Sequence, residues 1–197
     1  MTLSTLAAPA RLERIVKKSR FLAQAASIEQ PDHATAFLER VRATDASHHC
    51  WAWRVGPAYR SSDDGEPAGT AGRPILAAID GQGYDRVMVV VARWFGGTKL
   101  GAGGLVRAYG GTAAECLRAG ERLTLIERVR ASVVCGFEHV GAVHQLLARF
   151  EAIRHDEAYT DEGVRIGLDV PRPQLQPLQT ALRDATRGQA RLEEPSA

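Results

Sequence analysis

The sequence is poor in cysteine and in long apolar runs, and these two shortages argue against several classes of protein. Its three cysteines, Cys50, Cys116 and Cys135, are far apart, and no Cys-x-x-Cys occurs, so a disulfide framework or a zinc knuckle is not supported. No apolar run approaches the roughly 18 residues that a membrane-spanning helix needs. No basic segment followed by an apolar core occurs near the N-terminus. We therefore expect a cytoplasmic protein without a membrane partner.

Familiar catalytic motifs are missing as well. There is no Gly-x-Ser-x-Gly elbow around a nucleophilic serine. His48 and His49 are adjacent and alternate across a predicted strand, so they cannot bind one metal ion together. No residue pair is placed by its spacing as a base and its orienting partner. We expect no catalytic residue, metal or cofactor, and whether the protein is an enzyme stays open, with the balance against it.

The charge is nearly balanced overall but unevenly distributed. The 197 residues are 45% hydrophobic and 24% charged, which is typical of a folded globular protein, and the net charge is +2. Residues 1–120 contain 15 basic and 11 acidic side chains, whereas residues 121–197 contain 10 and 12. A polyanion is therefore expected to contact the first part of the chain.

A glycine-rich loop lies between a predicted strand, residues 87–92, and a predicted helix, residues 105–117. Backbone N–H groups of such a loop and of the first helical turn can converge on an anion. Neither the phosphate loop of nucleotide hydrolases nor the dinucleotide fingerprint matches its spacing. Lysine is rare in this chain, so Lys99 indicates a compact point charge placed for a purpose. The predicted anion or RNA site comprises Arg73, Arg93, Gly96, Gly97, Lys99, Gly101, Gly103, Gly104 and Arg107. The alternative is that the glycines only permit positive φ angles and close packing.

A second loop combines carboxylates and hydroxyls before a short predicted helix, residues 75–80. Clustered carboxylates can hold Mg²⁺, or they can stabilise turns and pair with Arg73 and Arg93. Both interpretations stay open for this candidate ligand or metal loop, which comprises Ser62, Asp63, Asp64, Glu66 and Thr70.

Hydrophobic periodicity divides the chain into two predicted domains, residues 1–127 and 128–197. In the second domain the order of the expected elements is βαββαβ, which is the ferredoxin-like arrangement. Its strands are expected at 129–137, 152–159, 164–170 and 190–192, and its helices at 139–150 and 173–185. In the first domain we expect strands at 12–16, 20–28, 47–55 and 58–61 and a helix at 31–41.

Three segments together resemble the IMPACT (YigZ) family: residues 46–54 (ASHHCWAWR), 62–74 (SDDGEPAGTAGRP) and 93–109 (RWFGGTKLGAGGLVRAY). His49 and Trp94 depart from the residues that the family usually has there, asparagine and tyrosine. The resemblance implies an α+β protein whose N-terminal domain has the ribosomal-protein S5 domain 2-like fold, with helices on one face of its sheet. It also implies a ferredoxin-like second domain similar to the last domain of elongation factor G. Eukaryotic members regulate translation through a protein partner.

Three functions remain open at this point. One is a translation-associated regulator that binds RNA phosphates or a ribosomal or other protein partner through the basic loop. Another is an enzyme that binds nucleotide or transfers phosphoryl groups with Mg²⁺, using Lys99 and the loop of Asp63, Asp64 and Glu66. The third is a protein-interaction module in which both loops are structural.

Overall fold

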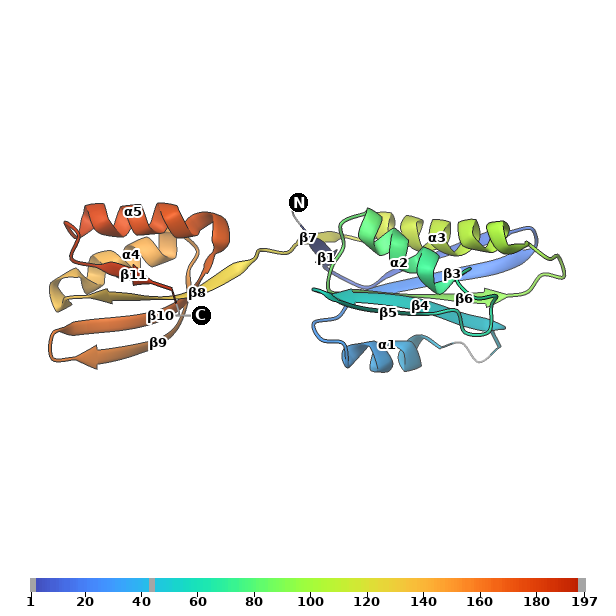
Figure 1. The fold of residues 1–197 in the computed structure, drawn as a ribbon, viewed down its shortest axis with the longest axis horizontal. Helices are drawn as coiled ribbons and strands as arrows, with labels where there is room; N and C mark the ends of the chain where they lie inside the picture. The colour runs from blue at the N-terminus through green and yellow to red at the C-terminus, as the bar shows by residue number, and fades with distance from the viewer. Residues whose placement is uncertain (1–2, 43–44, 195–197) are drawn as a thin grey trace. The chain divides into compact units, whose positions relative to one another are not determined.

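The chain folds into two compact units, Met1–Leu125 and Ile126–Ala197. The structure is a computed structural model, and it describes residues 3–42 and 45–194. The outermost residues of the two predicted domains, 1–2 and 195–197, lie outside these ranges. Both units combine helices with antiparallel strands (Figure 1), so the predicted α+β class is confirmed.

A five-stranded antiparallel sheet forms the centre of the first unit, with the strand order β2-β3-β6-β4-β5. The central strand β6 contains the apolar run 87–92, and all its residues except Trp94 are buried. This confirms the predicted strand at residues 87–92, and the burial shows that the strand is covered on both faces. The strands are β2 (Ala10–Val16), β3 (Ser19–Ser27), β4 (His48–Val55), β5 (Ala58–Ser62) and β6 (Val87–Trp94).

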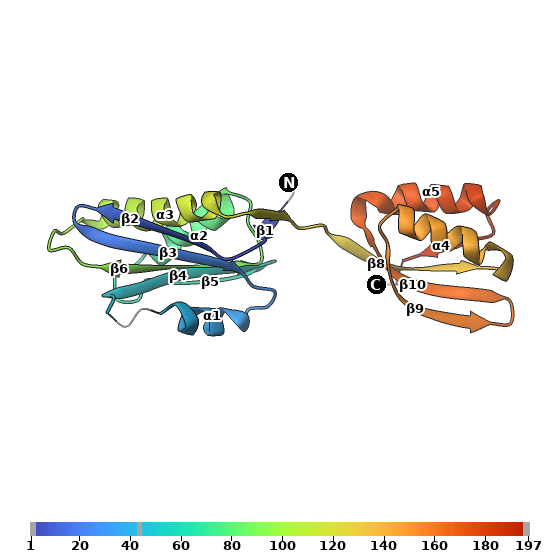
Figure 2. The ribbon, with the colours of Figure 1, turned by 180° about the vertical axis from the view of Figure 1, so that it is seen from behind.

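Helices cover both faces of this sheet. The helices α2 (Gly72–Gly81) and α3 (Ala102–Ala119) lie on one face, and α1 (His33–Val41) lies on the other (Figures 1 and 2). On the α1 side, Phe37 packs with Met88 and Val90 in a separate buried cluster. The expectation of helices on one face is thus wrong for α1, because β6 presents apolar side chains on both faces and each needs a cover.

Two three-residue strands were not predicted. They are β1 (Ser4–Leu6) and β7 (Arg122–Thr124), and they pair antiparallel with each other. The side chain of Leu6 is 1% exposed and belongs to the main core of the first unit. Strands this short contain too few residues for an alternating pattern to be recognised.

The second unit has the ferredoxin-like order of elements, β8-α4-β9-β10-α5-β11, and its sheet has the order β11-β8-β10-β9. This confirms the predicted βαββαβ arrangement. Short 3₁₀ helices, η1 (Phe137–His139) and η2 (Arg172–Gln174), precede the two α-helices. The longer elements are β8 (Arg128–Cys135), α4 (Val140–Arg149), β9 (Ile153–Thr160), β10 (Gly163–Pro171), α5 (Leu175–Ala185) and β11 (Arg191–Glu193).

The core of the second unit lies between its sheet and its two helices, where Val133, Ile166 and Leu178 are fully buried. Of the helices in the described ranges, none is sufficiently long and apolar to cross a membrane.

Candidate anion-binding site

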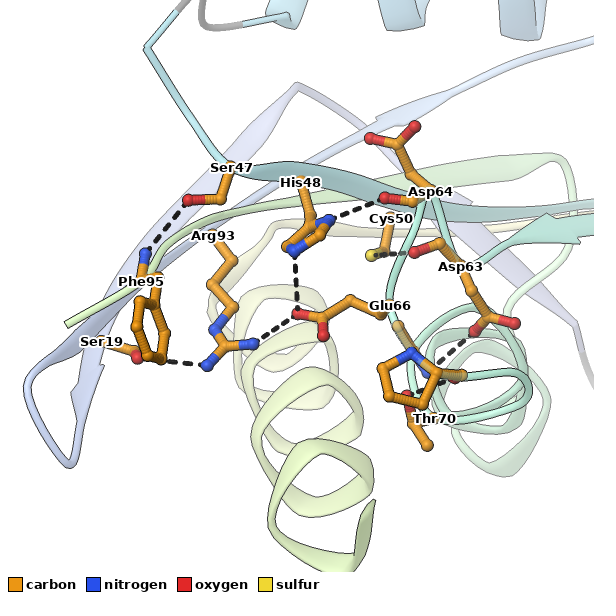
Figure 3. Close-up of polar contacts among 12 residues, drawn as sticks. Ser19, Ser47, His48, Cys50, Asp63, Asp64, Glu66, Thr70, Arg93 and Phe95 are labelled. Carbon is orange, nitrogen blue, oxygen red and sulfur yellow. Dashed lines mark hydrogen bonds and ion pairs between the residues drawn. The ribbon is translucent and has the colours of Figure 1, made fainter. Parts of the chain in front are cut away.

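Strand register brings the two predicted loops to the same end of the first unit's sheet. His48, at the start of β4, pairs with Arg93 near the end of β6, and Trp51 of β4 pairs with Ser62 at the end of β5. The carboxylate loop (residues 62–71) and the glycine-rich loop (residues 93–104) therefore leave the sheet side by side. Figure 3 shows contacts between side chains of the two loops.

A buried ion pair joins the loops. Arg93 Nη1 donates to Glu66 Oε1 at 2.6 Å, and the side chains are only 6% and 4% exposed. The hydroxyl of Tyr109 in α3 donates to the same carboxylate oxygen at 2.7 Å, and Nε2 of His48 lies 4.0 Å from it (Figure 3 shows the Arg93 and His48 contacts). Arg93 Nη2 also donates to Ser19 Oγ at 3.3 Å.

These contacts correct the prediction for Arg93. Its charge is neutralised inside the protein by Glu66, so it does not belong to the exposed surface that a phosphate could approach. Glu66, in turn, is a structural partner of Arg93 and Tyr109, which is the pairing alternative that the sequence left open.

Asp63 holds the carboxylate loop and the start of α2 together. Its Oδ1 accepts hydrogen bonds from the N–H groups of Ala71 and Gly72, at 2.9 and 2.8 Å, and its Oδ2 accepts one from Gly69 at 2.8 Å. Burial opposes ionisation, but these three N–H groups, helped by the nearby charge of Arg73, outweigh it and lower the pKa of Asp63.

The other polar residues of the carboxylate loop are also bonded within the protein. Asp64 Oδ2 accepts from the N–H of His49 at 2.6 Å, Thr70 Oγ1 donates to the carbonyl of Pro67 at 2.6 Å, and Ser62 Oγ accepts from the N–H of Asp64 at 3.3 Å. Across the described ranges, no cluster of three or more His, Cys, Asp or Glu side chains is arranged to hold a metal ion. The contacts therefore favour turn stabilisation for this loop.

The thiol of Cys50 lies beneath the same loop. It is fully buried and donates to the carbonyl of Asp63 at 2.9 Å (Figure 3). Burial raises its pKa to about 12, so it remains a protonated thiol and not a nucleophilic thiolate at neutral pH. Cys116 and Cys135 are buried as well, so all three cysteines are small core residues.

Individual glycines of the second loop have different roles. A Cβ atom on Gly96 would lie 2.0 Å from the carbonyl oxygen of Lys18, so packing requires a glycine there. Gly97 and Gly101 have φ angles of 81° and 71°, which residues other than glycine rarely adopt. Gly103 and Gly104 have helical backbones, and a Cβ on Gly103 would touch only the guanidinium of Arg107, at 3.6 Å.

The remaining cations of the prediction are exposed. Lys99 precedes α3, Arg107 lies in its second turn and Arg73 lies in the first turn of α2, and all three side chains are exposed. Among the residues that the structure describes, none of the three has a carboxylate within ion-pair distance. Arg107 Nη1 reaches back over Gly103, so this charge lies toward the N-terminus of α3.

Lys17 and Lys18 are relevant residues that the sequence analysis did not include in the site. They form the turn between β2 and β3, and both are exposed. The carbonyl of Lys18 lies against Gly96, so this turn touches the glycine-rich loop. The rarity of lysine, which singled out Lys99, would have identified this pair too, because these three are the only lysines in the sequence.

Several cations of the second unit pair with carboxylates. On its open sheet face, Arg165 pairs with Glu193 at 2.7 Å and His155 contacts Asp169 at 2.7 Å. A depression of about 450 Å³ lies on this face, lined by residues of both charges. Its mixed charge makes it a weaker candidate for a polyanion than the end of the first unit.

Comparison with known proteins identifies the family. Residues 17–117 match the Impact N-terminal domain, and residues 133–189 match a domain of unknown function (DUF1949). The chain belongs to the IMPACT family. It is 50% identical over 175 residues to the IMPACT family member in pol 5′region of Thermus thermophilus, covering 88% of this chain and 97% of that protein. It is 36% identical over 193 residues to the IMPACT family member YigZ of Escherichia coli K12, covering 94% of each.

A solved structure supports the same assignment for the fold. A crystal structure of a hypothetical protein superposes on this IMPACT family member with a TM-score of 0.71 and 34% sequence identity, over 99% of this chain and 98% of that one. The predicted membership of the IMPACT family is therefore confirmed, and both units of the chain are covered by family matches.

Proposed function

We propose that this IMPACT family protein is a cytoplasmic, translation-associated regulator that binds RNA phosphates through the glycine-rich basic loop of its first unit. Membership of the family supports a role related to translation. The observation that carries the proposal is the pair of exposed cations, Lys99 and Arg107, on either side of the first turn of α3. Neither has a carboxylate partner among the described residues.

The first turn of α3 adds backbone donors to these charges. Its N-cap residue is Gly101, and no side chain caps the turn. The N–H groups of a first helical turn have no partner within the helix, and an 18-residue helix places partial positive charge there. Arg107 extends over Gly103 toward this end, so side-chain and backbone donors lie together.

Gly103 supports the same function. Glycine is a poorer helix former than alanine, yet neither positive φ nor packing requires it at this exposed position in the first turn of α3. A glycine without a structural reason leaves the backbone open to close approach by a ligand.

Phosphate contacts make binding sensitive to salt. Each phosphate of a single strand that a cation neutralises contributes about −0.7 to the slope of log affinity against log salt. Contacts by Lys99 and Arg107 give a slope of about −1.4, and a third contact by Arg73 gives about −2.1. Binding through so few charges is modest in affinity and indifferent to sequence.

Fluorescence anisotropy of a labelled oligouridylate, measured over a series of salt concentrations, tests the proposal. Lys99→Ala and Arg107→Ala should each make the slope less steep by about 0.7 and weaken binding at low salt. Arg118→Ala is the matched control, because Arg118 is an exposed arginine at the other end of the same helix. If Arg118→Ala weakens binding as much as Arg107→Ala does, the loop is not the RNA site.

A further inference from the structure

The turn between β2 and β3 has an unusual backbone for the residues it contains. Lys17 and Lys18 have φ angles of 44° and 70°, so both central residues of this two-residue hairpin loop are in the left-handed region. Turns of this kind favour Asn-Gly, because residues with larger side chains adopt positive φ only at a cost. The fold holds two exposed lysines here although a more favourable turn sequence exists.

This turn is fixed against the glycine-rich loop. The N–H of Gly96 donates to Ser19 Oγ at 3.2 Å, and Gly96 packs on the backbone of Lys18 without room for a Cβ atom. The neighbouring cross-strand pair is Arg20 with Trp94. The lysine pair therefore lies at the same end of the sheet as the start of the loop that carries Lys99.

An exposed aromatic ring lies next to this contact. Phe95 directly precedes Gly96, and 52% of its surface is exposed. Its N–H donates to Ser47 Oγ at 3.3 Å, and its ring centre lies 5.5 Å from the guanidinium carbon of Arg93 (Figure 3). The ring of Trp94, in contrast, is already covered by Arg20 at 3.6 Å.

We propose that this end of the sheet is a binding surface for single-stranded RNA, on which an unpaired base stacks on Phe95 and neighbouring phosphates contact Lys17 and Lys18. The inference rests on the proposed function. It places the RNA strand that contacts Lys99 and Arg107 also across the turn formed by Lys17 and Lys18. Stacking on aromatic rings combined with a cationic track is how single strands are held without sequence preference. In a duplex, the bases are stacked on one another, so no unpaired base is free to stack on the ring of Phe95.

The two parts of the surface have different experimental signatures. Stacking is not a charge contact, so Phe95→Ala should weaken oligouridylate binding by roughly five- to a hundredfold without changing the salt slope. The double variant Lys17→Asn/Lys18→Gly should make the slope less steep by about 1.4. That variant installs the preferred turn sequence, so its melting temperature should rise and lost binding cannot be attributed to misfolding.

Anisotropy with the labelled oligouridylate, alone and annealed to oligoadenylate, provides the test. The wild type should prefer the single strand, and Phe95→Ala should remove most of that preference. Tyr59→Ala is the control, because Tyr59 is 60% exposed on β5 and lies beside the hairpin at the opposite end of the sheet. It should bind as the wild type does.

Failure of this inference can be told apart from failure of the proposed function. If Phe95→Ala and Lys17→Asn/Lys18→Gly bind as the wild type does while Lys99→Ala and Arg107→Ala bind less, the extended surface is refuted and the loop site stands. Equal wild-type affinity for single strand and duplex would also overturn the extended surface. If the wild type binds neither probe, both proposals are wrong.

Discussion

Removing the carboxylate of Glu66 should destabilise the first unit strongly. The change Glu66→Ala leaves the guanidinium of Arg93 in a site where its side chain is 6% exposed, with Ser19 Oγ as its remaining side-chain partner. It also removes the acceptor of the buried hydroxyl of Tyr109. Arg93 Nε already has no hydrogen-bond partner among the described residues, so little else compensates the charge.

The expected loss follows from this burial. Breaking a buried ion pair by removing one partner costs about 3–5 kcal/mol, because the other charge remains desolvated. With a urea dependence of about 2 kcal/mol per molar for a domain of this size, the unfolding midpoint should fall by roughly 2 M. Replacing both partners, as in Glu66→Leu/Arg93→Met, should cost much less than the single change, because no unpaired charge is left.

Intrinsic tryptophan fluorescence during urea unfolding is the appropriate assay. The three tryptophans, Trp51, Trp53 and Trp94, all belong to the first unit, so the signal reports on that unit alone. Glu115→Ala is the matched control, because Glu115 pairs with Arg14 at 3.0 Å but both side chains are more than one-third exposed. Exposed pairs of this kind contribute about 1 kcal/mol or less.

A small effect would refute the reasoning. If Glu66→Ala and Glu115→Ala shift the midpoint equally, Glu66 and Arg93 do not form the buried link between the two loops. If the double variant is no more stable than Glu66→Ala, the penalty does not come from an unpaired Arg93.

Three further predictions concern neighbouring residues. The lowered pKa of Asp63 means that its ionised carboxylate stabilises the folded protein fully at neutral pH, and that this stabilisation is lost as pH falls below about 4. Asp63→Asn should therefore unfold more easily than the wild type at pH 7 and lose less stability on acidification, as followed by circular dichroism. Cys50 has a pKa raised by burial to about 12, so a thiol reagent at pH 8 should modify it only after urea unfolding, and fast labelling of the native protein would contradict this. Gly96→Ala should lower the melting temperature, because the added Cβ meets the carbonyl oxygen of Lys18. Gly103→Ala should raise the melting temperature slightly and weaken RNA binding. Equal melting temperatures of the two variants would be evidence against the close packing of Gly96 on Lys18.

Local sequence patterns predicted most elements because their hydrophobic periods are clear. The run 87–92 predicted the buried strand, and the alternation and helical stripes of residues 128–197 predicted the ferredoxin-like order. The position of α1 was not predictable, because its amphipathic pattern shows that it covers a sheet but not which face it covers. Both faces of β6 are apolar. Val89 and Val91 lie on one face, and Met88 and Val90 lie on the other.

Within the candidate site, residue types were predictable but their pairing was not. The carboxylate and glycine-rich loops were both identified, and of the two interpretations left open for the carboxylates, pairing with an arginine is what the structure shows for Glu66 and Arg93. Nothing in the sequence marks Arg93 as buried, since its partner Glu66 is 27 residues away and reaches it only through the strand register. Tyr109 was recognised as helical, but its contact with Glu66 depends on how α3 packs on the sheet.

Ribosome co-sedimentation tests the central claim most directly. The wild type and the double variant Lys99→Ala/Arg107→Ala should be compared at low salt, after matching far-ultraviolet spectra and melting temperatures show that both are folded. We expect the wild type to sediment with ribosomes and to be released as salt rises, whereas the double variant stays in the supernatant. Equal sedimentation of the two folded proteins at low salt would show that the glycine-rich loop serves packing and does not bind a polyanion.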